Sequence, residues 1–443
     1  MRSAERAMPL AALTPGRQVT LSLLWLGLNV QTAALLPIVL PTQILLFVSP
    51  GEVGGAQQAT FLGWFSALGA LIALVVPPWV GARSDHTTGS YGRRRPYIGI
   101  GALLLLLGAV VLAVTGSLAT LLIGFLVFQL GNSICTAGYQ GLIPDLVPEG
   151  QRGTASGYMG LMTILGNGGS LVLAGALLGA VSATSAPGVT KQGSALFYVI
   201  TGAVLLLTVG VTLLRVREAP LSVVIATPEP MSWRRRLLAE WGAPWRQHDF
   251  FWVFLTRCAV MTGLTLFLTF IEYYFANVAH ITNFVQETAV LALLALLGGL
   301  VSAFWLGTLS DRIGRVPVVC ASTACMALAA LAFVVLPAGT PLWPLGLLFG
   351  LGYGAYTSTD WALAVDTLPS LTMAGKDMGL WSIATTLPAV VAPLIGGLIL
   401  GLTGASGQSA LGYRLVFAVA VITLIAGAVF ILMVRRERPG AGG

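Results

Sequence analysis

The sequence predicts an all-α membrane protein with twelve transmembrane helices in two six-helix bundles. Of its 443 residues, 56% are apolar and 9% are charged, whereas a soluble domain carries roughly a quarter charged residues. The mean hydropathy is +0.88. The apolar residues gather in twelve stretches, each long enough to cross a bilayer as a helix. This composition excludes a disordered chain, a disulfide-rich secreted module and a soluble enzyme.

The apolar stretches are separated by polar connections. They cover residues 19–47, 59–81, 97–115, 118–143, 154–181, 195–214, 250–278, 288–309, 317–337, 342–365, 377–402 and 411–434. The longest connection, 218–248, divides the chain into an amino-terminal bundle (1–217) and a carboxy-terminal bundle (249–443). Within this linker, residues 233–241 carry apolar side chains at i, i+4 and i+8 beside three arginines. That pattern predicts a short interfacial helix, with a solvated basic linker as the alternative.

The basic residues predict the orientation of the chain. Of 23 Lys and Arg, twenty lie on one side of the predicted helices, only Lys191 and Arg414 lie on the other, and Arg257 lies inside a helix. By the positive-inside rule the basic side is cytoplasmic. We therefore expect a multi-pass protein of the cell (inner) membrane with both termini in the cytoplasm.

Motifs for bound metals and nucleotides are missing from the sequence. The four cysteines lie inside apolar stretches without a C-x-x-C pattern, and the three histidines are far apart. No G-x-x-x-x-G-K-[ST] sequence occurs. We expect no metal, no cofactor and no nucleic-acid partner.

Two pairs of polar motifs recur in the two halves. GARSDHTTGSYGRRRP follows the second predicted helix and GTLSDRIGRVP follows the eighth, so Asp85 and Asp311 are equivalent, 226 residues apart. PDLVPEGQRGTASGYMGL follows the fourth helix and VDTLPSLTMAGKDMGLWS the tenth, so Asp145 and Asp366 are equivalent, 221 residues apart. Duplication of a six-helix unit explains both offsets.

The loop after the eighth helix matches the G-x-x-x-D-R-x-G-R pattern of the major facilitator superfamily, which the chain resembles over essentially its whole length. The matching residues are Gly307, Asp311, Arg312, Gly314 and Arg315. In the first loop His86 follows Asp85, and six residues separate Asp85 from Gly92. This stretched loop, with NVQTAALLP in the first helix, is similar to the sucrose/proton symporter and glycoside–pentoside–hexuronide branches.

The resemblance implies the major facilitator fold and a secondary transporter that works by alternating access, without catalysis. At the helix ends, a carboxylate can meet the positive amino terminus of another helix and a nearby arginine, which predicts a latch between the halves. The alternative is that the arginines only anchor the helices to anionic lipid. The residues expected in the latch are Gly81, Asp85, Gly92, Arg93, Arg94, Arg95, Asp145, Arg152, Gly307, Asp311, Arg312, Gly314, Arg315 and Asp366.

Three ionisable residues lie inside predicted helices, where each is a candidate functional residue. Arg257 and Glu272 are in the seventh helix and Asp360 is in the tenth. The helical rise puts Arg257 and Asp360 at similar depth, so we expect them to pair and to take part in proton coupling. Alternatively, Arg257 extends to the headgroups and Glu272 is a carboxylate at the rim.

Polar residues concentrate in helices 1, 4, 7 and 10, the helices that line the central cavity in the superfamily. The expected substrate-binding residues are Asn29, Gln31, Asn132, Tyr139, Gln140, Tyr353, Tyr356 and Trp361. Their alternative role is to hydrogen-bond or pack against neighbouring helices.

Amides and aromatic hydroxyls with few charges suit a neutral, hydroxyl-rich solute, which predicts proton-coupled sugar (glycoside) symport. The alternatives are a proton-driven exporter of amphipathic compounds, a lipid flippase or a non-transporting sensor. The expected partners are the solute, protons and membrane lipids, and we expect a monomer.

The predicted topology places residues on either side of the sixth helix in different compartments. Reporter fusions after Gly188 and after Ser232 should therefore report opposite sides of the membrane, with the second in the cytoplasm. Alkaline phosphatase and green fluorescent protein fusions measure this. Equal sidedness at the two sites would show that the number of spans between them is wrong.

Overall fold

The computed structural model describes the chain as a set of long helices. The described residues are 12–44, 46–47, 52–88, 91–178, 187–216, 218, 241–242, 244–279, 284–336, 343–370, 373–405 and 409–435. The α-helices are α1 (Pro15–Thr32), α2 (Leu40–Ile44), α3 (Glu52–Asp85), α4 (Arg95–Ala113), α5 (Leu118–Gln140), α6 (Leu142–Leu146), α7 (Arg152–Leu178), α8 (Pro187–Arg215), α10 (His248–Asn277), α11 (Phe284–Ile313), α12 (Arg315–Val335), α13 (Trp343–Asp366), α14 (Ala374–Ala405) and α15 (Ser409–Ile431). Within these ranges there is no strand.

Eleven helical segments in the described part of the chain are long and apolar enough to cross a membrane. The remaining predicted span corresponds to α13, which has 24 residues and is therefore long enough. Its hydropathy is lowered by the polar run from Thr357 to Asp360. With α13 included, the predicted twelve-helix fold class is confirmed.

The first predicted span, 19–47, is not one continuous α-helix. α1 ends at Thr32, and a π-helical turn at Leu35–Val39 connects it to α2. Pro37 lies in this turn, where its missing N–H and its ring are incompatible with a regular helix. The break is therefore a local consequence of the sequence.

The helices pack around two apolar clusters. One consists mainly of residues from α1–α8 and extends to Trp361, Met378 and Trp381. The other consists of residues from α10–α15. The two halves therefore share part of their apolar packing through α13 and α14. The predicted interfacial helix in the linker lies outside the described residues, except for its last position, Trp241.

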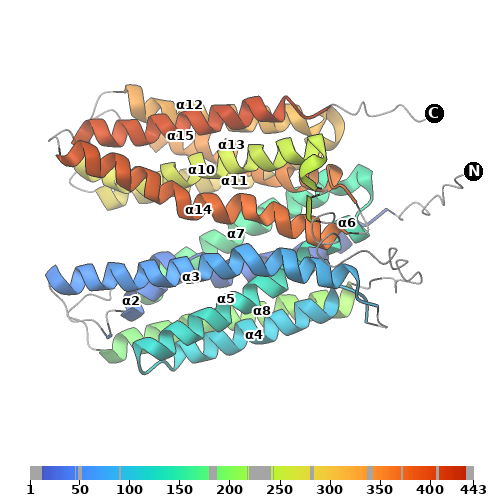
Figure 1. Cartoon of the computed structure of the whole chain (residues 1–443), viewed down its shortest axis with the longest axis horizontal. Coiled ribbons are helices and arrows are strands. Elements are labelled where there is room, and N and C mark those ends of the chain that lie inside the picture. Colours follow the sequence, from blue (N-terminus) through green and yellow to red (C-terminus); the bar gives the residue numbers. More distant parts are fainter. Residues whose placement is uncertain are drawn as a thin grey trace, which may run out of the picture.

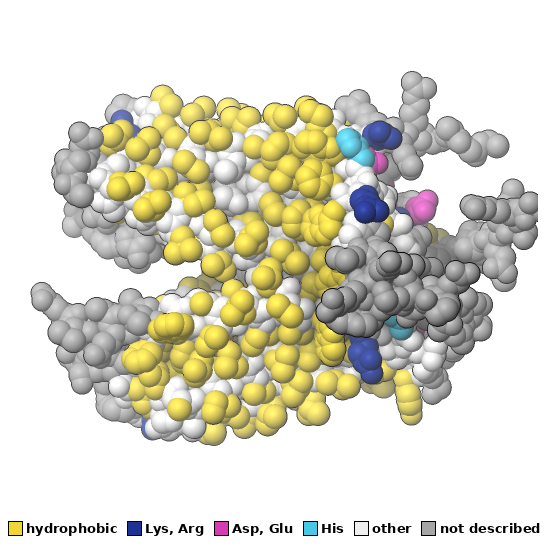
Figure 2. Space-filling model, viewed as in Figure 1, with side chains coloured by type: hydrophobic (Ala, Val, Ile, Leu, Met, Phe, Trp, Pro, Cys, Tyr) yellow, Lys and Arg dark blue, Asp and Glu magenta, His cyan; other side chains and the backbone are white. Residues whose placement is uncertain are grey.

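The two halves meet at one end of the molecule and separate toward the other. α3 and α14 approach each other at the right of Figure 1 and diverge to the left. We call the closed end the basic end: there α3 and α11 end and α4, α7, α12 and α14 begin. Most of the charged side chains visible in Figure 2 gather at this end, and a gap separates the halves at the opposite, open end.

Close backbone contacts make the closure at the basic end possible. α3 packs on α14, and α7 packs on α11 and α13. A Cβ atom on Gly379 of α14 would lie 2.5 Å from Cα of Pro78 in α3, and one on Gly307 of α11 would lie 2.7 Å from Cα of Gly157 in α7. Because atoms cannot approach so closely, these glycines are required for the observed separation of the helices.

We predict that Gly379→Val favours a conformation that is open at the basic end. The added side chain overlaps the α3 backbone, and overpacking of this kind costs about 1–3 kcal/mol. Spin labels at the exposed positions of His86 and Arg312, in a cysteine-free background, report the separation of the halves. The distance distribution should shift to longer values.

Gly397→Val is the matched control, since Gly397 is also in α14 but a Cβ there would meet nothing within 4 Å. An unchanged distance in Gly379→Val, or the same change in both variants, would contradict the prediction.

Candidate functional site

Two carboxylates at the basic end join the halves in the same way. Asp85, the last residue of α3, accepts hydrogen bonds from the backbone N–H groups of residues 375 and 376 at 3.0 and 2.9 Å. Asp311, near the end of α11, accepts them from residues 153 and 154 at 2.8 and 2.9 Å. These N–H groups lie in the first turns of α14 and α7 and have no intrahelical acceptor. Each carboxylate therefore caps a helix of the other half and is stabilised by its positive end.

Each half also contains an arginine–aspartate pair in which the arginine follows a glycine with positive φ. Gly92 has φ +90° and Gly314 has φ +91°, a conformation that strongly favours glycine. Arg93 donates from Nε to Oδ2 of Asp145 at 2.9 Å. Arg315 pairs with Asp366 in the equivalent way. The internal repeat is thus visible as a repeated set of contacts.

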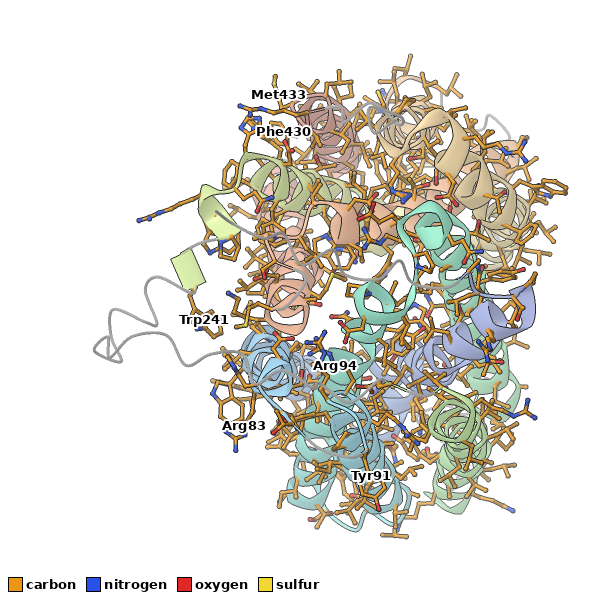
Figure 3. The ribbon with its side chains drawn as sticks, turned by 90° about the vertical axis from the view of Figure 1, so that its right-hand side faces the viewer. Arg83, Tyr91, Arg94, Trp241, Phe430 and Met433 are labelled. Atoms are coloured by element: carbon orange, nitrogen blue, oxygen red, sulfur yellow. The ribbon has the colours of Figure 1, made fainter. Side chains whose placement is uncertain are left out.

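The first half contains an additional arginine in this network. Arg94 is fully buried; its Nη2 lies 2.6 Å from Oδ1 of Asp85 and its Nε lies 3.1 Å from Oδ2 of Asp145. In the second half, Arg315 alone contacts both Asp366 and Asp311, the latter at 3.3 Å. Seen from the basic end, Arg94 lies in the centre of the molecule, whereas Arg83 and Tyr91 lie at its edge (Figure 3). Arg94 therefore supplies the positive partner of Asp85, although the residue that follows Asp85 is His86 and not an arginine.

The other predicted latch residues have different places. Arg152 crosses between the halves and donates to Oδ1 of Asp366 at 2.9 Å. Arg95 bonds the carbonyl of Leu213 within its own half. Gly81 packs closely on the backbone of α14. Arg312 is exposed and is not part of the network among the described contacts.

Glu218 belongs to this network, but the sequence patterns did not predict it as a latch residue because it only marks the start of the linker. Its carboxylate accepts hydrogen bonds from the backbone N–H groups of residues 93, 94 and 95 at 2.7, 2.9 and 3.0 Å. It therefore caps α4. Burial raises the pKa of Glu218, and the three backbone donors act in the opposite direction.

Between the basic end and the open end, Arg257 of α10 forms an ion pair with Asp360 of α13. The Nε of Arg257 also donates to Oγ1 of Thr385 at 2.8 Å, and its guanidinium lies 3.6 Å from the ring centre of Trp381. The hydroxyl of Tyr356 donates to Oδ1 of Asp360 at 3.1 Å. A buried charge pair is tolerated when further hydrogen bonds support it, and here Thr385 supports the arginine and Tyr356 the carboxylate.

A row of aromatic rings extends from this ion pair into the other half. Tyr139 of α5 stacks on Trp25 of α1 at 5.6 Å, Trp25 meets Trp361 edge to face at 5.6 Å, and Trp361 meets Trp381 at 4.9 Å. Trp25 also donates from Nε1 to Oγ1 of Thr163 at 2.6 Å. The four rings connect the halves directly across the centre of the molecule. Sequence patterns did not indicate Trp25 or Trp381, because tryptophan in an apolar helix looks like packing.

The predicted substrate-binding residues fall into two groups, those that are partly exposed and those that are buried. Asn29, Asn132 and Tyr353 are partly exposed, and Asn29 donates to the carbonyl of Trp25 at 2.7 Å. Tyr139, Tyr356 and Trp361 are buried in the ring and ion-pair contacts described above.

Two of the predicted substrate-binding residues have other surroundings. Gln31 is fully buried on the face of α1 that carries Leu24 and Leu28 of the apolar cluster, so it lines no open cavity in this state. Gln140 accepts a hydrogen bond from the hydroxyl of Ser382 at 2.8 Å and joins α5 to α14 across the halves. The side chain of Glu272 lies outside the described part of the chain.

The sequence model of the Major Facilitator Superfamily matches residues 19–374 and 300–443. The chain belongs to this superfamily. The predicted resemblance is confirmed.

Relatives of known name differ in how much of the chain they match. Sucrose transport protein SUC3 of Arabidopsis thaliana is 29% identical over 121 residues, 22% of this chain and only 20% of that protein. Multidrug resistance protein MdtG of Enterobacter lignolyticus is 28% identical over 429 residues, 93% of this chain and 90% of that protein.

Solved structures show the same fold. The fucose:proton symporter FucP of E. coli superposes with a TM-score of 0.69 at 17% identity, covering 93% of this chain and 98% of that chain. FucP in its outward conformation gives a TM-score of 0.68. At this level of identity the likeness concerns the fold alone.

We predict that Asp85→Asn and Asp311→Asn slow transport much more than they weaken solute binding, because both side chains cap helices and lie away from Arg257 and Asp360. Loss of charged hydrogen bonds costs about 1.5–3 kcal/mol, which shifts a conformational equilibrium by about one to two decades. Uptake rates and equilibrium binding of the same solute measure the two effects.

Arg312→Gln is the control, since this exposed residue lies outside the network and should leave both quantities unchanged. Normal uptake by both aspartate variants would show that the loops only set the orientation of the helices in the membrane and do not hold the halves together.

Proposed function

We propose that the protein is a proton-coupled symporter of a neutral, hydroxyl-rich solute such as a sugar or glycoside. The observation that carries the proposal is the buried Arg257–Asp360 pair at the end of a row of aromatic rings. The pair offers a carboxylate that can gain and lose a proton, and the rings offer a surface for a solute.

The coupling follows from the electrostatics of the pair. While Arg257 lies beside Asp360, the charged carboxylate is stabilised. If α10 moves relative to α13, Asp360 loses its partner in a membrane interior and binds a proton. Small movements of two helices from the same half therefore load and release a proton. Tyr356, Thr385 and Trp381 hold the two side chains in place.

The surroundings of the pair support a neutral solute. Flat aromatic faces suit the C–H faces of a sugar ring, and amides and hydroxyls suit its hydroxyl groups. Asn29 and Thr163 are partly exposed and supply such groups beside Trp25. Tyr353 is partly exposed on α13, three residues before Tyr356. The names of two similar proteins, a sucrose transport protein and a fucose:proton symporter, agree with this choice.

The orientation belongs to the same proposal. The basic end faces the cytoplasm of a cell whose inner membrane holds the protein, in agreement with the positive-inside rule. The conformation described here is then outward-facing, because the halves are closed at the basic end and separate at the other (Figure 2). FucP in its outward conformation has a similar fold.

A second candidate is a proton-driven exporter of amphipathic compounds. The match to MdtG over 93% of the chain favours it, and aromatic rings also bind apolar compounds. The two candidates differ in the direction in which a proton gradient drives the solute.

We predict that Asp360→Asn abolishes uphill accumulation and leaves solute exchange largely intact. The amide mimics the protonated carboxylate and has no proton to release. Arg257→Ala should have the same effect, because it leaves Asp360 unpaired and protonated. Proton-driven uptake and counterflow exchange of radiolabelled sucrose and fucose in proteoliposomes measure the two activities, with the dye rhodamine 6G as the amphipathic compound.

Thr262→Val is the control, since Thr262 lies in the same helix as Arg257 and, among the described residues, its hydroxyl bonds the carbonyl of Cys258 in its own helix. Undiminished accumulation by Asp360→Asn would remove this residue from the mechanism. Proton-driven expulsion of the dye, without sugar uptake, would favour the exporter.

A further inference from the structure

A buried carboxylate at the beginning of α14 has no part in the coupling described above. Asp377 is 1% exposed. Its Oδ1 lies 3.4 Å from Nζ of Lys376, and the backbone of Ser370 also bonds its carboxylate. The charged group that faces it from α3 is Asp85, which is itself paired with Arg94 of the α4 terminus.

The position of Asp377 relates it to the central ion pair. Asp377, Trp381 and Thr385 recur at i, i+4 and i+8, so they share one face of α14. Trp381 and Thr385 both contact Arg257. One helical turn, about 6 Å, separates Asp377 from Trp381 in the direction of the basic end. Asp377 therefore lies between the Arg257–Asp360 pair and the basic end.

Two polar atoms on this face lack hydrogen-bond partners among the described residues. They are Oδ1 of Asp377, whose contact with Lys376 is long for a hydrogen bond, and Nε1 of Trp381. Buried polar atoms are nearly always paired, and exceptions call for an explanation in function. Lys376 and the backbone of Ser370 hold the carboxylate of Asp377, and its Oδ1, which lacks a short hydrogen bond, can take up a proton.

We propose that Asp377 is the acceptor on the cytoplasmic side for the proton that Asp360 releases. The inference rests on the proposed proton-coupled transport. When the halves separate at the basic end, the contacts of Gly375 and Gly379 with α3 are lost and water reaches Asp377. The O–H bond of Asp360 then breaks, Arg257 pairs again with the carboxylate, and the proton moves through water to a carboxylate oxygen of Asp377.

The same movement explains how Asp377 passes the proton on. In the closed state the carboxylate of Asp85 accepts hydrogen bonds from the backbone N–H groups of residues 375 and 376, so it lies at the same end of α14 as Asp377. Separation of α3 from α14 removes Asp85, and Lys376 becomes the nearest charge. Lys376 favours the ionised carboxylate, so the O–H bond of Asp377 breaks and the proton enters the cytoplasm. Opening of the latch and proton release are thereby one event.

The test uses right-side-out membrane vesicles, in which the lumen corresponds to the cytoplasm and its pH can be set. The probes are radiolabelled sucrose and fucose supplied together, with pyranine in the lumen to report proton arrival. In Asp377→Asn, proton-driven uptake and proton arrival should fall at least about tenfold while sugar exchange stays near the wild-type rate. The dependence of uptake on lumenal pH should disappear, and Asp377→Glu should restore it.

Asp366→Asn is the matched control, because Asp366 is a carboxylate of the latch at the same end but pairs with Arg152 and Arg315. It should change uptake and exchange together and keep the dependence on lumenal pH. An unchanged pH dependence in Asp377→Asn, or equal slowing of uptake and exchange, would overturn the inference. If the wild-type protein took up sugar at a rate that did not depend on the proton gradient, the proposed function itself would be contradicted.

Discussion

Closure of the basic end depends on a carboxylate that caps a helix of the opposite half. α7 and α14 begin inside the protein, where their first N–H groups need an acceptor that water does not supply. Asp311 and Asp85 provide it only when the halves touch. The glycines beside these caps let the backbones approach, and the arginines neutralise the carboxylates. The helix caps, the close backbone packing and the Arg152–Asp366 pair therefore form one unit that is lost when the halves separate, whereas the other arginine–aspartate pairs lie within one half and remain.

The two copies of this unit keep the same cap and differ in the side chains around it. In the first half Arg94 joins Asp85 to Asp145, whereas in the second Arg315 contacts both carboxylates and Arg152 arrives from the other half. The longer first loop and the missing arginine after Asp85 are thus compensated locally. A duplicated fold can preserve a backbone contact while the charges that support it are redistributed.

The fold and part of the site were predictable because they depend on local sequence. Apolar stretches give the spans, and the helical rise alone puts Arg257 and Asp360 at one depth. The contact of Trp25 with Trp361 was not predictable, since the two residues are far apart in sequence and both look like packing residues. The direction of Gln31 depends on how α1 rotates in its bundle, which no short pattern determines. Glu218 caps a helix that lies more than a hundred residues earlier.

The low apolarity of α13 has a consequence for how the protein is made. A charged residue within a span makes insertion costly, and α13 carries Asp360 within an already polar run. α10 precedes α13 in the chain, so Arg257 is present in the membrane before Asp360 arrives. The partner that offsets part of the cost of placing Asp360 in the membrane is therefore already in the chain when the tenth span is made.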